Sequence, residues 1–251
     1  MTTISLPVRY NRYFPADHPH GSTDKIDYLP ASSTAFLLVD VYHAAEKPEA
    51  KSLVNTRWDQ KWGEIVNENL APALRAAREA GFPVIYVMNS SPRIEMSKSA
   101  FGFRLQESLG FNPEKDFRET GVDPREYCYG DPVQLVIPPV IAPRESDYYL
   151  RKHTYSGFFE TRLASLLNTL SIQNLIVVGF VADCCILFTL ADAVFRGYHT
   201  VLLRDCTLAV EWDEEIEIFS NTQRTVKWIE SIICPSALSK DFIDALKKPY
   251  D

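Results

Sequence analysis

Three residues of complementary chemistry stand where apolar stretches of the sequence end. Asp40 closes TAFLLVD, Lys152 closes DYYLRK, and Cys185 follows NLIVVGF after a short turn. A thiol can attack a carbonyl carbon once a base removes its proton. A carboxylate in a closed crevice can be that base when burial and a neighbouring cation set its proton affinity. The three residue types therefore predict nucleophilic catalysis by a cysteine.

Two cysteines stand together near the amino end of a predicted helix, where exposed amide groups and the helix dipole favour a thiolate. They are Cys184 and Cys185. No G-x-S-x-G motif is present, and none of the 5 histidines forms an obvious pair with a cysteine. The 5 cysteines include no C-x-x-C pair, so we expect reduced thiols. Cys128, Cys206 and Cys234 are expected to be small buried hydrophobic residues.

Apolar runs and helical periodicity alternate along most of the chain. Runs typical of buried parallel strands occur at 34–40, 83–89, 174–180 and 199–206, with a short strand expected at 147–152. Helical spacing marks 57–80, 158–170, 185–197 and part of 211–233, and a terminal helix is expected after Pro235. We therefore predict an α/β fold with a mainly parallel sheet and helices on both faces, a Rossmann-like three-layer architecture.

The predicted topology brings the candidate residues together, because reactive groups in an open parallel sheet gather beyond the carboxyl ends of the strands. Asp40, Asn89, Lys152, the turn at 181–185 and Asp205 stand at those ends. We expect one domain over residues 31–251, preceded by an N-terminal arm at 1–30. A proline-rich stretch at 110–146 is interpreted as a long excursion that forms a lid or a subunit contact.

Composition excludes several classes of function. The formal net charge is −7, with lysines and arginines scattered along the chain, so no basic surface for nucleic acid or an anionic membrane is expected. The start of the sequence has no apolar stretch of signal-peptide length, and no later stretch reaches the length of a membrane span. We expect a cytoplasmic protein that acts on a small molecule. The His18 and His20 pair is interpreted as solvated loop, because two nitrogen ligands do not complete a zinc site.

Three motifs carry a resemblance to a known family. They are LLVD at 37–40, K-x-x-YSGFF-x-T at 152–161 and G-x-x-x-D-x-C at 179–185, followed by RGYHTVLLRD. In order and spacing they resemble the isochorismatase-like cysteine hydrolases, from about Thr34 to Ile233. The segment at 152–161 is especially similar to the branch of ureidoacrylate, biuret and triuret amidohydrolases. The resemblance implies the isochorismatase-like α/β fold.

The resemblance also implies a role for each candidate residue. Cys185 is expected to be the nucleophile, Asp40 the general base and acid, and Lys152 the third member of the triad. Cys184 is then expected to be structural. Backbone amides of Ala182 and Cys185 are expected to form an oxyanion hole beside a cis peptide at Val181–Ala182.

Substrate binding is predicted for a second set of residues, because such pockets combine aromatic walls with a few polar groups. The set comprises Tyr42, Asn89, Tyr155, Phe158 and Gln223. Two positions depart from the family pattern, with Tyr42 where glutamine is common and Ala182 where threonine is common. The Asp-x-His and HDWHP-like ligand segments of the nicotinamidase branch do not appear near YVMNSSPR, so no metal and no cofactor is expected.

Three hypotheses for function follow. The first is hydrolysis of a C–N bond in a small linear amide or ureido compound through an acyl-enzyme, with release of ammonia or an amine. The second is isochorismatase-type vinyl-ether hydrolysis, which does not require the cysteine in the same way. The third is a non-catalytic binding protein on the same fold. The resemblance and the long excursion also predict a homo-oligomer, either a dimer or a tetramer.

Overall fold

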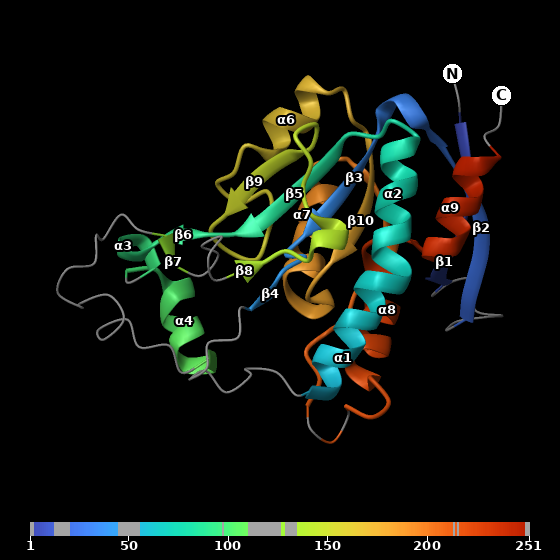
Figure 1. Cartoon of the computed structure of the whole chain (residues 1–251). Helices are drawn as coiled ribbons and strands as arrows, with labels where there is room; N and C mark the ends of the chain where they lie inside the picture. The colour runs from blue at the N-terminus through green and yellow to red at the C-terminus, as the bar shows by residue number, and fades with distance from the viewer. Residues whose placement is uncertain are drawn as a thin grey trace.

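The computed structural model describes residues 3–12, 21–44, 56–96, 98–109, 127–128, 135–212, 214 and 216–248. Its main feature is an eight-stranded sheet with the strand order β2-β1-β12-β11-β10-β3-β5-β9 (Figure 1). In that order the strands span Gly21–Pro30, Thr3–Arg12, Ser236–Ala237, His199–Leu203, Asn174–Gly179, Thr34–Val39, Val84–Asn89 and Tyr148–Lys152. Two short ladders join β4 (His43–Ala44) to β8 (Leu135–Val136) and β6 (Ser91–Pro92) to β7 (Tyr127–Cys128).

The strands from β12 to β9 run parallel to one another. Every residue of β3, β5 and β10 is buried, because helices cover both faces of the sheet. Continuous apolar runs were the basis for predicting these strands, and the predicted fold class is confirmed.

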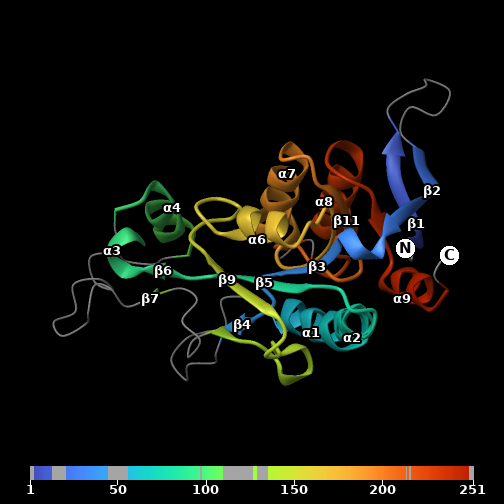
Figure 2. The same ribbon diagram turned by 90° about the horizontal axis from the view of Figure 1, so that it is seen from above.

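Helices form the two outer layers (Figure 2). One layer contains α1 (Thr56–Glu64), the π-helical segment η2 (Ile65–Leu70), α2 (Ala71–Glu79) and α9 (Ser239–Lys247). The other contains α6 (Leu163–Thr169), the π-helical segment η4 (Ala182–Ile186), α7 (Leu187–Phe195) and α8 (Ser220–Ile232). Two separate clusters of buried apolar side chains result, one on each face of the sheet. In the described residues, no helix is both long and apolar enough to cross a membrane.

Smaller elements extend from this sandwich. They are η1 (Ala31–Ser33), α3 (Arg93–Met96), α4 (Ala100–Leu109) and η3 (Pro139–Ile141). Figures 1 and 2 both place α3 and α4 at the end of the molecule opposite the β1–β2 hairpin. Of the predicted excursion at 110–146, only 127–128 and 135–146 belong to the described residues. The remainder, like His18 and His20, lies outside them.

The segment predicted as an N-terminal arm contains two strands of the main sheet. β1 and β2 form an antiparallel hairpin, and β1 pairs with β12 at Arg9 and Ser236. Its alternate residues Ile4, Leu6 and Val8 are buried in the core cluster. The Arg9 guanidinium also forms an ion pair of 2.9 Å with the buried carboxylate of Glu230 on α8. The hairpin therefore shares its sheet and its hydrophobic core with the rest of the domain.

Candidate active site

Three parallel strands bring the predicted triad to one edge of the sheet. Asp40 directly follows β3, Lys152 is the last residue of β9, and Cys185 lies in η4, just after β10. The backbone φ angle of Asp40 is 49°, in the left-handed region that aspartate tolerates better than most residues. Relative exposures of Asp40, Lys152 and Cys185 are 4%, 0% and 6%. The three side chains therefore meet away from bulk water.

The Lys152 ammonium is the centre of this group. Its Nζ lies 2.7 Å from Asp40 Oδ2 and 3.3 Å from Cys185 Sγ. It also donates to Asn89 Oδ1 and, at 3.0 Å, to the Thr154 carbonyl. Burial alone lowers the pKa of Lys152, but its attraction to the Asp40 carboxylate, together with its hydrogen bonds to Asp40 and Cys185, outweighs burial and leaves the pKa raised. The direction of this pKa shift favours the charged form of Lys152.

The two oxygens of Asp40 have different surroundings. Oδ1 accepts a hydrogen bond of 2.8 Å from the Asn89 backbone amide. Oδ2 faces the Lys152 ammonium as an ion pair, and among the described residues no hydrogen bond to it has regular geometry. One oxygen thus fixes the carboxylate, while the other keeps lone pairs that can take a proton.

Cys185 is held as a neutral thiol. Its hydrogen bond with Cys184 and its burial raise the pKa of Cys185 well above the ordinary value, and Asp40 adds to this effect. Lys152 acts in the opposite direction but does not prevail. The helix terminus favours a thiolate at this position, whereas burial and the neighbouring Cys184 and Asp40 favour the neutral thiol, so the thiolate expected from the sequence stays a prediction.

The predicted oxyanion hole needs a correction. The Ala182 amide donates a hydrogen bond of 2.9 Å to the Leu208 carbonyl, so it is already engaged within the protein. The cis peptide lies at Phe180–Val181, one residue before the predicted position. Among the described residues the Val181 amide has no hydrogen-bond acceptor. Val181 thus replaces Ala182 as the candidate donor beside Cys185.

Of the residues predicted to bind substrate, two form part of the triad's support. Asn89 is 4% exposed, and its side chain accepts from Lys152 while donating to the Tyr42 hydroxyl at 2.8 Å. Asn89 therefore links Tyr42 to the lysine and, through its backbone, to Asp40. These bonds indicate a positioning role for Asn89, on strand β5 beside Lys152.

The other three predicted binding residues are dispersed. Tyr155 lines a cavity described below. Phe158 is buried at 3% exposure and stacks on Tyr198, with ring centroids 5.8 Å apart, so it is a core residue. Gln223 is exposed on α8, where its amide nitrogen donates to the Ile218 carbonyl. The structure thus does not bring Phe158 or Gln223 to the cavity wall.

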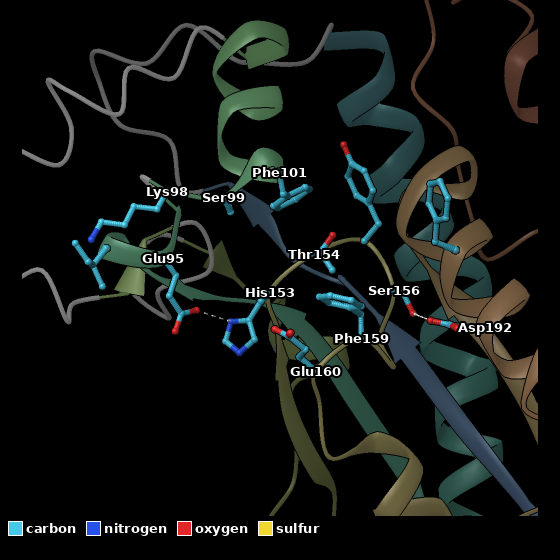
Figure 3. A pocket seen from close by; sticks show the side chains of 13 residues that line it. Glu95, Lys98, Ser99, Phe101, His153, Thr154, Ser156, Phe159, Glu160 and Asp192 are labelled. Carbon is cyan, nitrogen blue, oxygen red and sulfur yellow. Dashed lines mark hydrogen bonds and ion pairs between the residues drawn. The ribbon is translucent and has the colours of Figure 1, made fainter.

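Figure 3 shows a cavity of about 800 Å³ that is lined by His153 and Thr154, which directly follow Lys152 in the chain, and by none of the three triad residues themselves. Its wall combines α3, α4, α7 and the segment that follows Lys152, through the residues Ile94, Glu95, Lys98, Ser99, Phe101, His153, Thr154, Tyr155, Ser156, Phe159, Glu160, Phe188 and Asp192. Sequence reasoning missed Phe101 and Phe188. Phe188 had a usable signal, because it follows Cys185 by three positions in a predicted helix and such residues share a face.

The described residues contain no group of three or more histidine, cysteine, aspartate or glutamate side chains able to hold a metal ion. The expectation that the protein needs no metal or cofactor stays a prediction. Asp205, another strand-end acid, accepts two hydrogen bonds from Ser239 at the start of α9 and is therefore structural.

The fold and site define an α/β protein whose parallel strands hold an aspartate, a lysine and a cysteine at one edge. The family model of the isochorismatase domain matches residues 34–230. The chain therefore belongs to the isochorismatase domain family.

Several known proteins are similar to this chain. Ureidoacrylate amidohydrolase RutB of Agrobacterium fabrum is 26% identical over 81% of this chain and 89% of that protein. The uncharacterized isochorismatase family protein YaaI of Bacillus subtilis is 37% identical, but over only 36% of this chain and 49% of its own length. A cysteine hydrolase structure from Pseudomonas syringae pv. phaseolicola 1448A has a TM-score of 0.64 at 20% identity, covering 87% of this chain and 94% of that chain. This likeness supports the fold alone.

Proposed function

We propose that the protein is a cysteine-dependent amidohydrolase that cleaves a C–N bond in a linear amide or ureido compound. The observation that carries this proposal is the contact of one buried ammonium, Lys152, with both the Asp40 carboxylate and the Cys185 thiol. Such an arrangement keeps a base next to a nucleophile in a site of low polarity. The similarity to ureidoacrylate amidohydrolases over most of the chain supports the same class of reaction.

The reaction begins from a neutral thiol, an aspartate anion and a lysine cation. As Cys185 Sγ attacks the substrate carbonyl carbon, its proton passes to Asp40 Oδ2, and the carbonyl oxygen gains the negative charge. Backbone amides of Val181 and Cys185 are our candidates to stabilise that oxyanion. The Lys152 ammonium lowers the energy of whichever neighbour is anionic during the transfer.

Collapse of the tetrahedral intermediate breaks the C–N bond, and the proton on Asp40 moves to the departing nitrogen. Ammonia or an amine leaves, and a thioester joins the acyl group to Cys185. Asp40, again a carboxylate, then takes a proton from water as that water attacks the thioester. The acid product leaves, and the thiol regains its proton from Asp40.

Replacing each of the two adjacent cysteines tests the proposal. Cys185→Ser should lower turnover by more than about a thousandfold, because a hydroxyl is a far weaker nucleophile in this setting. Cys184→Ser is the matched control and should keep most of the activity. Release of ammonia or amine would be measured with biuret, triuret, ureidoacrylate, carbamoyl amino acids and simple amides. Full activity of Cys185→Ser, or loss confined to Cys184→Ser, would show that the nucleophile is assigned wrongly.

A further inference from the structure

The cavity beside the triad is large for the smallest linear ureido compounds. A pocket of about 800 Å³ lies toward the upper end of the range that encloses drug-sized ligands. Biuret, by contrast, has only a handful of non-hydrogen atoms. Most of the cavity would remain filled with water around such a substrate, so the cavity has room for a further group on the substrate.

Three links join this cavity to the reacting residues. The Thr154 carbonyl accepts a hydrogen bond of 3.0 Å from Lys152, and Thr154 itself lines the cavity. Burial, and then the neighbouring Cys184 thiol, raise the pKa of the Tyr155 hydroxyl, another lining group. Phe188 lies three residues after Cys185 along the same helical run. A substrate bound at Cys185 therefore has the cavity as its neighbouring space.

Aromatic rings form the part of the wall next to the nucleophile. Tyr155 stacks on Phe188 with centroids 5.5 Å apart and an interplanar angle of 15°. Phe101 meets Tyr155 edge-on, with centroids 4.8 Å apart and an angle of 89°. Phe188 remains 48% exposed, so a large part of its surface is available to a ligand. A flat apolar group of a substrate would bind to such a wall most favourably, because it can stack on the aromatic rings.

The charged side chains of the cavity wall do not favour binding of a substrate with a negatively charged group. Glu95, Glu160 and Asp192 contribute three carboxylates, against the single ammonium of Lys98 among the described lining residues. Figure 3 shows Asp192 joined to Ser156, and Glu95 near His153. A carboxylate on the substrate would meet more like than opposite charge there.

We propose that this cavity receives a neutral, flat apolar group of the substrate, so that the preferred substrates are aryl-bearing amides or ureido compounds. Linear ureas and amides with a carboxylate tail would then be poorer substrates. Phe188, Tyr155 and Phe101 would determine this specificity. The inference rests on the proposed amidohydrolase function and extends it to a class of substrate.

A matched set of amides tests the inference. We would compare kcat/KM for propionamide, hydrocinnamamide and N-benzylpropionamide, together with glutaramate and biuret, by following the acid and the released ammonia or amine. At least one aryl amide should exceed propionamide by about tenfold or more, the gain expected for burying a ring. Glutaramate and biuret should stay below it. Equal values for all five compounds, or a preference for glutaramate or biuret, would overturn the inference.

Two phenylalanine variants on α7 locate the effect. Phe188→Ala should reduce the ratio of kcat/KM for the aryl amide to that for propionamide by about tenfold. Phe195→Ala is the matched control, since Phe195 is 82% exposed and does not line the cavity, and it should leave the ratio unchanged. An unchanged ratio in Phe188→Ala would contradict the proposal that Phe188 contacts the aryl group of the substrate.

Failure of this inference differs from failure of the proposed function. If cleavage requires Cys185 but shows no aryl preference, only the substrate class is wrong. If none of the amides or ureas is cleaved and none acylates Cys185, the amidohydrolase function is wrong as well.

Discussion

Lys152 explains how a carboxylate and a thiol can share a buried site. A buried carboxylate without a partner would cost several kcal/mol or take up a proton. The ammonium lies 2.7 Å from Asp40, and two further oxygens, from Asn89 and Thr154, accept its hydrogen bonds. The ammonium therefore offsets the cost of burying the Asp40 carboxylate beside the Cys185 thiol.

Removing the Lys152 ammonium should destabilise the folded protein, because the Asp40 carboxylate would be buried without a counter-charge. Lys152→Met should abolish turnover and lower the free energy of unfolding by about 3–5 kcal/mol at neutral pH, because it leaves Asp40 buried and uncompensated. The deficit should shrink as the pH falls. Protonation of the carboxylate removes the uncompensated buried charge and therefore favours folding.

A second substitution provides the control for this prediction. Adding Asp40→Asn to Lys152→Met removes the unpaired charge and should restore about 1–3 kcal/mol, measured by urea unfolding at several pH values. Strictly additive losses in the double variant would mean that the two residues are not energetically coupled. Lys152 would then be structural, and the triad would have to be withdrawn.

The sequence was sufficient to predict which residues form the site, but not the protonation or the hydrogen bonds of those residues. Asp40, Lys152 and Cys185 could be predicted because each stands at a strand end and in a family motif. Their protonation could not, since the pKa of Cys185 depends on its hydrogen bond with Cys184 and on burial. The position of Asn89 at a strand end was visible in the sequence, but its bonds to both Lys152 and Asp40 depend on the register of β5 with β9.

At the scale of elements, continuous apolar runs were reliable and alternating ones were overlooked. β3, β5 and β10 each contain an apolar run of four or more residues, are buried throughout, and were predicted with nearly their observed limits. β1 alternates buried Ile4, Leu6 and Val8 with more exposed residues, and Pro7 occupies one of the exposed positions although proline argues against a strand in the sequence. β12 pairs with β1 only at Arg9, so Pro7 stands where β1 has a single neighbouring strand.

One glycine allows strands β3 and β10 to approach each other closely. Gly179, the last residue of β10, has a φ angle of 125°, and a Cβ built there would lie 1.9 Å from the Val39 carbonyl oxygen. That carbonyl accepts a hydrogen bond from Phe180 and directly precedes Asp40. Gly179→Ala should therefore displace Asp40, reduce turnover strongly and destabilise the fold by about 3 kcal/mol or more.

A glycine in an open helical position gives the control for this prediction. Gly63 in α1 has no atom within 4 Å of an added Cβ, so Gly63→Ala should keep full activity and stabilise the protein by about 0.5–1 kcal/mol. Thermal unfolding and turnover of both variants would be compared. Normal activity and stability of Gly179→Ala would show that the close approach of β3 and β10 is not required.

At the scale of the whole molecule, several large apolar side chains face outward. Trp228 and Ile232, four residues apart on α8, are 55% and 49% exposed and so lie next to each other on the surface of that helix. We therefore retain the prediction of a homo-oligomer, either a dimer or a tetramer. Light scattering should give at least twice the chain mass of 28.6 kDa at micromolar concentrations. A mass near 28.6 kDa throughout that range would contradict the prediction.

The central claim is that Cys185 carries the acyl group during turnover. Intact-protein mass spectrometry after rapid acid quenching of the enzyme with a slowly deacylating ester of the substrate acid would detect that group directly. We expect one acyl mass per chain, located by peptide mapping on Cys185, present in Cys184→Ser and absent from Cys185→Ser. Catalytic turnover without any adduct on Cys185, or an adduct located on Cys184, would contradict the account.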